Sequence, residues 1–369
     1  MPKSPKIPYV NLSAQWREER SELLPIIESV FSKGQFVGGQ AIDTFEHKIS
    51  EYCKVKYCVS LNSGTDALTL ALFLSGVRKG DEVITPPNSF IASTAVICHL
   101  GATPVFVDVE SDQNIDVRKI EAAITNKTKV LMPVHLTGRI CEMTAIKQIA
   151  SKYKLKIIED AAQAIGSMYD NQKGGSFGDI GCFSTHPLKN LNASGDGGFI
   201  TTNDENVFLQ AKSLVNHGIE NRDKVSQFGF VSRMDTLQAE ILSFRLDRLE
   251  DVIEKRRTNA RRYVESLNLD EIFIPPEKEV EFNTYHTFVI QAENRDALYE
   301  FLLNRGVETA IHYPVPIHLQ PAAKSLGYEK GDFPVTERQA KSILTLPINQ
   351  FVSEQDANYV IKLIKEFYS

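Results

Sequence analysis

A lysine in a glycine-flanked loop is the first residue whose type and surroundings suggest chemistry. Lys189 lies in the run GCFSTHPLKNL at 181–191, ahead of GDGG at 195–198. A lysine in a polar loop is ordinarily solvated, but the residues beside Lys189 are small or apolar and indicate partial burial. Burial disfavours the ammonium form and leaves an amine that can attack a carbonyl. The loop therefore contains either a solvated lysine or a catalytic amine.

A carboxylate at the end of a hydrophobic run is the second candidate. Residues 157–163 read IIEDAAQ, which places Asp160 directly after an expected strand at 156–159. Asp160 could hold a positively charged ring nitrogen through a charge-assisted hydrogen bond. It could equally cap a following helix, and Gln163 fits a capping box as well as a cofactor contact.

The third candidate is an anion site at residues 63–66 (SGTD), between an expected strand and an expected helix. The free N–H groups and the dipole at a helix N-terminus attract anions. Gly64 would let a phosphate approach the backbone, and Ser63 and Thr65 add hydroxyl groups. The same residues also suit an ordinary N-cap. Only together do the three candidates match one cofactor, since pyridoxal phosphate (PLP) requires a phosphate cup, a carboxylate for its ring nitrogen and an amine for a Schiff base.

Alternating strand-like and helix-like runs from about 55 to 205 would bring these candidates together. The pattern predicts an α/β fold with a largely parallel sheet, in which ligands bind at the carboxyl ends of the strands. The expected strands are 57–61, 82–85, 104–109, 129–136 and 156–159, and the expected helices are 66–75, 91–100, 116–124 and 143–153.

Residues 235–268 read as long helical sequence, and a compact α+β unit follows. Its expected strands are 285–291, 309–313 and 344–347, and its expected helices are 296–305 and 353–367. We place the domain boundary at 250. Residues 1–250 would then form a large PLP-binding α/β domain with an N-terminal arm, and residues 251–369 a small α+β domain.

Composition narrows the classes of function. The 369 residues include 41 basic and 47 acidic side chains, a formal net charge of −6, so no basic footprint for DNA or RNA is present. No apolar run is long enough for a membrane helix, and the first residues do not form a signal peptide, so the cytoplasm is the expected compartment. The 5 cysteines form no CxxC pair and no HExxH occurs. Neither a disulfide framework nor a metal site is therefore predicted.

The order of the motifs resembles that of the DegT/StrS-type nucleotide-sugar aminotransferases, PLP enzymes of fold type I. The resemblance runs essentially from end to end. It is carried by FVGG at 36–39, NSGTDAL at 62–68, GDEVITP at 80–86, GATPVFVD at 101–108, PVHL at 133–136, EDAAQ at 159–163, the Lys189 loop, NHG at 216–218, RMD at 233–235 with QA at 238–239, and HYPVPIH at 312–318.

The resemblance implies a role for each matching residue. Lys189 would bind PLP as a Schiff base and later move a proton, Asp160 would pair with the pyridine nitrogen, and Gln163 would reach the phenolic oxygen. The phosphate would be held by Ser63, Gly64, Thr65 and Ser184. Phe90 would stack on the ring, unless it is a core phenylalanine. The expected substrate-binding residues are His186, Tyr313 and His318; His186 could instead be an ordinary loop residue, and Tyr313 could simply pack between domains.

Two positions depart from the family pattern. In the segment GFVSR at 229–233, Val231 replaces an asparagine that reaches the phosphate of the neighbouring subunit's cofactor. Either Ser232 or another group substitutes, or cofactor affinity is lower. Thr185 stands where relatives commonly have an aromatic residue. A site shared between subunits implies a homodimer.

The substrate is argued by analogy between subfamilies. Asp196 in GDGG and the stretch 312–321 resemble enzymes that act at sugar C-3. The expected reaction moves an amino group from L-glutamate to a dTDP-3-keto-6-deoxyhexose, giving a 3-amino sugar for surface polysaccharide or secondary metabolites. Alternatives are a C-4 keto-sugar or a UDP-3-keto-sugar as acceptor, C–O cleavage or decarboxylation with the same cofactor, and a non-catalytic PLP-fold regulator. A Rossmann dehydrogenase is disfavoured because no GxGxxG follows the early strands.

Overall fold

A seven-stranded sheet forms the centre of the computed structural model, which describes residues 6–221 and 223–369. The strand order is β1-β9-β8-β5-β4-β2-β3. β9 alone runs antiparallel to its neighbours, and all other pairs are parallel, so the sheet is mixed but mostly parallel. The predicted α/β class is thereby confirmed. The strands are β1 (Tyr57–Leu61), β2 (Glu82–Thr85), β3 (Thr103–Phe106), β4 (Thr128–Leu131), β5 (Lys156–Asp160), β8 (Ile180–Ser184) and β9 (Gly198–Thr202).

Helices cover both faces of this sheet, because successive strand residues point to opposite sides. On β2, Val83 packs in one buried cluster with α3, α4 and α7, whereas Ile84 packs in another with α2, α6 and α8. The helices of this large unit are α1 (Leu12–Lys33), α2 (Gln40–Cys53), α3 (Gly64–Leu74), α4 (Ala92–His99), α5 (Val117–Ile120), α6 (Met143–Tyr153), α7 (Glu205–Leu214) and α8 (Thr236–Leu246).

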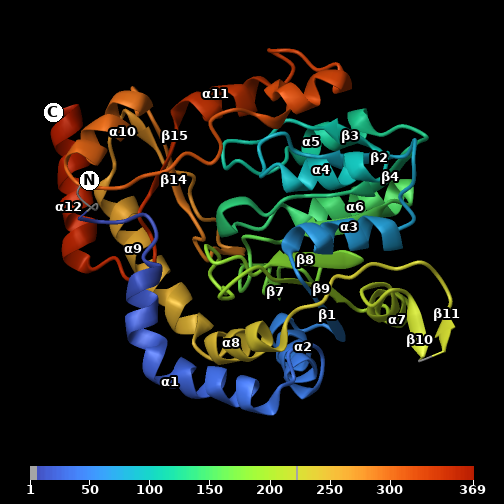
Figure 1. Cartoon of the computed structure of the whole chain (residues 1–369). Coiled ribbons are helices and arrows are strands. Elements are labelled where there is room, and N and C mark those ends of the chain that lie inside the picture. Colours follow the sequence, from blue (N-terminus) through green and yellow to red (C-terminus); the bar gives the residue numbers. More distant parts are fainter. Residues whose placement is uncertain (1–5, 222) are drawn as a thin grey trace.

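A smaller unit packs beside the sheet, and Figure 1 shows most of it at the left. Its three-stranded antiparallel sheet has the order β12-β14-β15. Its strands and helices are β12 (Ile272–Phe273), β14 (Phe288–Ala292), β15 (Ile343–Leu346), α9 (Leu249–Ser266), α10 (Arg295–Asn304), α11 (Pro334–Ser342) and α12 (Glu354–Tyr368). Two small sheets, β13-β6-β7 and β10-β11, complete the fold; their strands are β6 (Met168–Tyr169), β7 (Gln172–Lys173), β10 (Ile219–Asn221), β11 (Lys224–Val225) and β13 (Glu281–Phe282).

The hydrophobic cores of the two units both include residues from the other side of the proposed boundary at residue 250. Within α9, Ile253 belongs to a large-unit cluster, whereas Tyr263 belongs to the small-unit cluster. Ile7 of the N-terminal arm also packs in the small-unit cluster, and its amide donates to Gly306 at 2.9 Å. In the opposite direction, Phe333 before α11 packs on Phe106 at the end of β3. The division at 250 stays a proposal.

Several expected elements are shorter than the sequence pattern indicates. The strand expected at 129–136 ends at Leu131, and residues 136–138 form a 3₁₀ turn. The strand expected at 309–313 is reduced to one bridge between Ala310 and Thr345. The helix expected over 235–268 divides into α8 and α9, since Asp247 and Arg248 interrupt it. Periodicity does not reveal these breaks, because the apolar positions continue across them.

Of the helices formed by the described residues, none has the length and apolar character needed to cross a membrane. All 5 cysteines are free.

Candidate active site

The carboxyl ends of β1, β2, β5 and β8 meet at one edge of the sheet, where parallel strands of α/β folds bind ligands. Three of the segments that follow these strands contain the chemistry found in the sequence. The loop after β1 leads into α3, Asp160 ends β5, and Ser184 ends β8 ahead of the Lys189 loop.

The N-terminus of α3 faces the end of β8 at very close range. A Cβ atom on Gly64 would lie 2.6 Å from Cβ of Ser184, so only glycine fits here. Ser63 caps the helix, and its hydroxyl accepts the amide of Asp66 at 3.1 Å. The first N–H groups of a helix have no partner within the helix, and those of Gly64 and Thr65 thus suit an anion. Ser63 is therefore an N-cap of α3; its contact with an anion stays a prediction.

Asp160 is held by two donors in a buried position, with 5% of its surface exposed. The Ser93 hydroxyl donates to Oδ2 at 2.7 Å, and the Ala162 amide donates to Oδ1 at 3.2 Å. Burial raises the pKa of Asp160, and these hydrogen bonds and the charge of Lys189 act in the opposite direction. The residues directly after Asp160 form turns and then β6, so Asp160 is not a helix cap. Gln163 is also buried, and its Oε1 accepts the Thr137 amide at 2.7 Å.

Lys189 is a partly buried amine that shares this site with Asp160. Burial lowers the pKa of Lys189 to about 8, and the carboxylate of Asp160 partly opposes that shift. The loop is fixed on both sides of the lysine. The Lys189 amide donates to the His186 carbonyl at 2.8 Å, and the Asn190 side chain donates to the Thr284 carbonyl at 3.2 Å. Lys189 is therefore not an ordinary solvated lysine. Near pH 8 its amine is neutral in a large fraction of molecules.

Phe90 and Tyr313 lie together beside these groups. The two ring centroids are 5.9 Å apart, and Phe90 remains 56% exposed, so it is not a core residue. Burial, and next the carboxylate of Asp160, raise the pKa of Tyr313. Tyr313 therefore stays protonated and can donate a hydrogen bond. His186 is exposed in the Lys189 loop, and its Nδ1 accepts the Leu188 amide at 3.3 Å.

His318 lies in a different environment from the one expected for a sugar-binding residue. Its imidazole is buried against the ring of Phe333, with 4.7 Å between the centroids, and its Nε2 lies 3.1 Å from Oε1 of Glu337. These contacts join the segment around His318 to the start of α11. A direct contact of His318 with a sugar is thus not supported by the structure.

The structure also describes the two positions that depart from the family pattern, Val231 and Thr185. Val231 is 55% exposed, whereas Ser232 is buried and its hydroxyl lies 3.2 Å from Oδ1 of Asn62 in the same subunit. Ser232 is therefore engaged within its own subunit. Thr185 is buried and packs closely on Gly197, where an added Cβ would lie 2.3 Å from the Thr185 Oγ1.

Several residues of the site could not be identified from the sequence. Ser93 supports Asp160, and a fully buried pair, His135 and Glu159, lies immediately beside it. His135 Nε2 is 2.9 Å from Glu159, which also accepts the amides of Gly175, Phe177 and Gly178. Since Cys141 donates its amide to His135 Nδ1 at 3.2 Å, the proton of the neutral ring is on Nε2. The motifs PVHL and EDAAQ contain this pair, but only the fold shows that they meet.

Comparison with known proteins agrees with this geometry. The profile of the DegT/DnrJ/EryC1/StrS aminotransferase family matches residues 17–365. The chain belongs to this aminotransferase family. Among its relatives, the pleiotropic regulatory protein of Geobacillus stearothermophilus is 38% identical, covering 98% of this chain and 98% of that protein. The dTDP-3-amino-3,6-dideoxy-alpha-D-galactopyranose transaminase of Aneurinibacillus thermoaerophilus is 38% identical, covering 98% of this chain and 99% of the enzyme. A crystal structure of S. venezuelae DesV in complex with a ketimine intermediate is 36% identical, with a TM-score of 0.96 and 99% of each chain covered.

Family membership makes the chain a PLP-dependent aminotransferase of fold type I. The residues present fit that cofactor: an amine of lowered pKa, a buried carboxylate beside it, and a helix N-terminus where only glycine is tolerated. Among the described residues, no group of three or more His, Cys, Asp or Glu side chains could hold a metal ion.

Proposed function

We propose that this enzyme transfers the amino group of L-glutamate to the C-3 carbonyl of a nucleotide-linked keto-sugar, most specifically a dTDP-3-keto-6-deoxyhexose. The product is a 3-amino sugar for surface polysaccharide or secondary metabolites. The observation that carries the aminotransferase chemistry is the partly buried amine of Lys189 near the buried carboxylate of Asp160 at the sheet edge. The sugar and its position are supported by the related transaminase from Aneurinibacillus thermoaerophilus, whose name specifies a dTDP-linked 3-amino sugar.

Each site residue has a defined task in this proposal. PLP, when bound, supplies an electron sink for the negative charge left at a carbon that has lost its proton. Lys189 would hold the cofactor covalently and Asp160 would hold its protonated ring nitrogen. Gln163 would contact its phenolic oxygen, and Phe90 would cover its ring. The phosphate would be bound by the N–H groups of α3 with Ser63, Gly64, Thr65 and Ser184.

Lys189 would then move protons in two half-reactions. In the first, Nζ would take the proton from Cα of glutamate and deliver it to the cofactor, and water would then release 2-oxoglutarate. In the second, the same atom would take a proton from the cofactor and return it, as general acid, to C-3 of the sugar. A pKa of about 8 suits both directions, since the amine can accept and release a proton near neutral pH. His186 and Tyr313 would contact the sugar.

A single-turnover experiment tests the substrate. The enzyme is first treated with glutamate, so that its cofactor carries the amino group as pyridoxamine phosphate, and the donor is removed. It is then mixed separately with dTDP-3-keto, dTDP-4-keto and UDP-3-keto sugars. We expect amino sugar only from the dTDP-3-keto compound, detected by mass spectrometry. Product from the 4-keto sugar alone would remove the C-3 assignment, and product from the UDP sugar alone would remove the nucleotide assignment.

A regulatory role is the second candidate, favoured by the relative described as a pleiotropic regulatory protein. Lys189, Asp160 and Gln163 are all in place, which favours turnover. If the PLP-loaded protein forms no 2-oxoglutarate from glutamate, the regulatory function becomes the better supported hypothesis.

We further propose a homodimer whose subunits share their sites. Apolar side chains are exposed in two segments, Phe36 and Val37 in one, and Phe228, Phe230 and Val231 in the other. Val37 forms a bridge with Asp235, which follows the second segment along the chain. Phe228 is 99% exposed, which is unusual for an isolated subunit and typical of an interface residue. Sedimentation analysis tests this, with a dimer expected and a monomer contradicting it. The cytoplasm is the proposed compartment, since free cysteines suit a reducing environment.

A further inference from the structure

The polar groups that line a small cavity beside Lys189 are all basic or neutral. The N-terminal arm, the Lys189 loop, α9 and the residues after β15 line it, and its volume is about 30 Å³. Its polar side chains include Tyr9, Asn11, Gln15, Lys189, Arg256 and His286, and no described residue that lines it is acidic. The cavity is thus adjacent to the reactive amine and complementary to an anion.

Arg256 is a buried cation without a carboxylate partner in the described chain. Only 6% of its surface is exposed. Its guanidinium donates to the carbonyls of Tyr285 and His286, at 3.2 and 3.1 Å, and to Oε1 of Gln350 at 3.2 Å. Its Nε has no hydrogen-bond partner among residues 6–221 and 223–369. Burial lowers the pKa of Arg256 to about 10, so the group keeps its charge at neutral pH.

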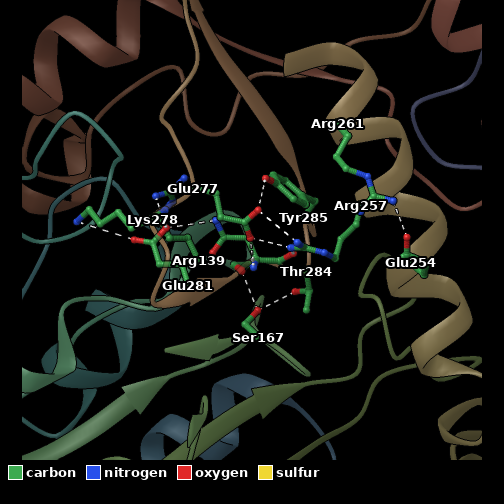
Figure 2. Close-up of polar contacts among 12 residues, drawn as sticks. Arg139, Ser167, Glu254, Arg257, Arg261, Glu277, Lys278, Glu281, Thr284 and Tyr285 are labelled. Atoms are coloured by element: carbon green, nitrogen blue, oxygen red, sulfur yellow. Dashed lines mark hydrogen bonds and ion pairs between the residues drawn. The ribbon is translucent and has the colours of Figure 1, made fainter. Parts of the chain in front are cut away.

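Other buried or half-buried arginines of the described chain are neutralised. Arg139 lies 2.6 Å from Glu281, and Arg257, the neighbour of Arg256 on α9, lies 2.7 Å from Glu277. Figure 2 shows both of these pairs. Arg295 lies 2.6 Å from Asp296. Burying a charge without compensation is costly, so the isolation of Arg256 calls for a partner that is not part of this chain.

His286 adds an unused polar atom to the same cavity. Its Nδ1 is buried and has no partner among the described residues. Burial, followed by the charges of Lys189 and Arg256, holds the pKa of His286 well below its ordinary value. The ring is therefore neutral and presents either a donor or an acceptor to a ligand.

We propose that this cavity receives a carboxylate of the amino donor, with Arg256 as its binding residue. The proposal rests on the aminotransferase function given above and identifies how the donor is recognised. A space of about 30 Å³ has room for a carboxylate. Its position next to Lys189 also suits a donor whose amine must reach the cofactor carbon that Lys189 would hold.

The test compares donor and acceptor half-reactions in Arg256→Gln and Arg256→Lys, with Arg257→Lys as the matched control on the same helix. Donors are L-glutamate, L-alanine, which lacks the distal carboxylate, and 4-aminobutyrate, which lacks the α-carboxylate. Calorimetry with 2-oxoglutarate gives a readout that does not require turnover, and thermal unfolding reports stability. A guanidinium–carboxylate contact predicts a loss on the order of 10- to 100-fold in glutamate and 2-oxoglutarate affinity for Arg256→Gln.

We expect Arg256→Gln to lose affinity for glutamate while keeping its rate with the keto-sugar, and Arg256→Lys to recover part of the loss. A variant that loses discrimination between glutamate and 4-aminobutyrate identifies the α-carboxylate; one that loses discrimination against alanine identifies the distal one. Equal losses in both half-reactions, or unchanged 2-oxoglutarate binding in a folded variant, would overturn the proposal. A wild-type enzyme that transfers no amino group would instead contradict the proposed function.

Discussion

Ser93 donates a 2.7 Å hydrogen bond to Oδ2 of Asp160, and both side chains are buried. Ser93 lies in the first turn of α4, whereas Asp160 ends β5, so the bond joins two elements of the sheet edge. A hydrogen bond to a charged acceptor stabilises the ionised form. Because burial raises the pKa of Asp160, Ser93 helps to keep charged the carboxylate that faces the ring nitrogen of PLP in the proposed function.

Replacing Ser93 with alanine is expected to raise the pKa of Asp160 and slow the glutamate half-reaction. A hydrogen bond to a charged group contributes about 1.5–3 kcal/mol, which corresponds to a rate loss of roughly 10- to 100-fold. Rapid-mixing spectroscopy of the PLP-loaded enzyme over a range of pH measures both effects. In an Asp160→Asn background the same change should cost little, because the charged acceptor is gone. Full additivity of the two substitutions would contradict the coupling.

The lowered pKa of Lys189 predicts a pH profile for the cofactor-free enzyme. The neutral amine reacts with carbonyl compounds, and its fraction rises as pH passes upward through about 8. Labelling by a small aldehyde, trapped by borohydride and followed by mass spectrometry, should therefore be half-maximal near that pH at Lys189. Because the carboxylate of Asp160 raises the pKa of Lys189, Asp160→Asn should move the midpoint to lower pH. A midpoint like that of the exposed lysines would contradict burial as the cause.

The close contact between Gly64 and Ser184 allows a test of the proposed phosphate site at the N-terminus of α3. In Gly64→Ala the new methyl group would meet Cβ of Ser184 at 2.6 Å, so α3 or β8 must shift. Overpacking of this kind costs about 1–3 kcal/mol, and we expect lower thermal stability together with weaker PLP binding. Adding Ser184→Gly should restore part of the stability. Gly195→Ala is the control, because there the nearest atom is 3.4 Å away. Equal effects at Gly64 and Gly195 would show that the close approach is unimportant.

Local sequence predicted most of what positions the site, and for physical reasons. β1 and β2 match their expected bounds because short apolar runs ended by turns have few other solutions in an α/β pattern. The contribution of Ser93 to Asp160 could not be found in this way, since the two residues are 67 positions apart. His318 was assigned to the sugar from its motif, yet its contacts with Phe333 and Glu337 depend on how a segment of the small unit folds back. Long-range packing decides such positions.

We expect the structure around Asp160 to depend on the negative charge of the buried neighbour Glu159. Its carboxylate accepts three backbone amides at 2.7–2.8 Å and faces His135, so each partner is a donor. Glu159→Gln would turn an NH₂ group toward these donors and is expected to destabilise the protein by about 3–5 kcal/mol, because a buried charged network is broken. Thermal unfolding and the PLP dissociation constant measure the loss. Glu265→Gln, at an exposed position of α9, should have no effect on either. A stable, tightly cofactor-binding Glu159→Gln variant would contradict this support.

Val231 gives the most direct test of the shared site, because a single substitution should add a contact across the proposed dimer. The position is 55% exposed in the isolated subunit, so an asparagine fits without repacking the core. If its amide reaches the phosphate in the neighbouring subunit, one hydrogen bond to a charged group should tighten PLP binding by about 10-fold or more. Val231→Ala, which removes methyl groups and adds no donor, is the control and should not tighten binding. The dissociation constant of PLP, measured at a protein concentration where the dimer is intact, compares the two. Since Ser232 already contacts Asn62, unchanged affinity in Val231→Asn would mean that a group from elsewhere fills the phosphate site.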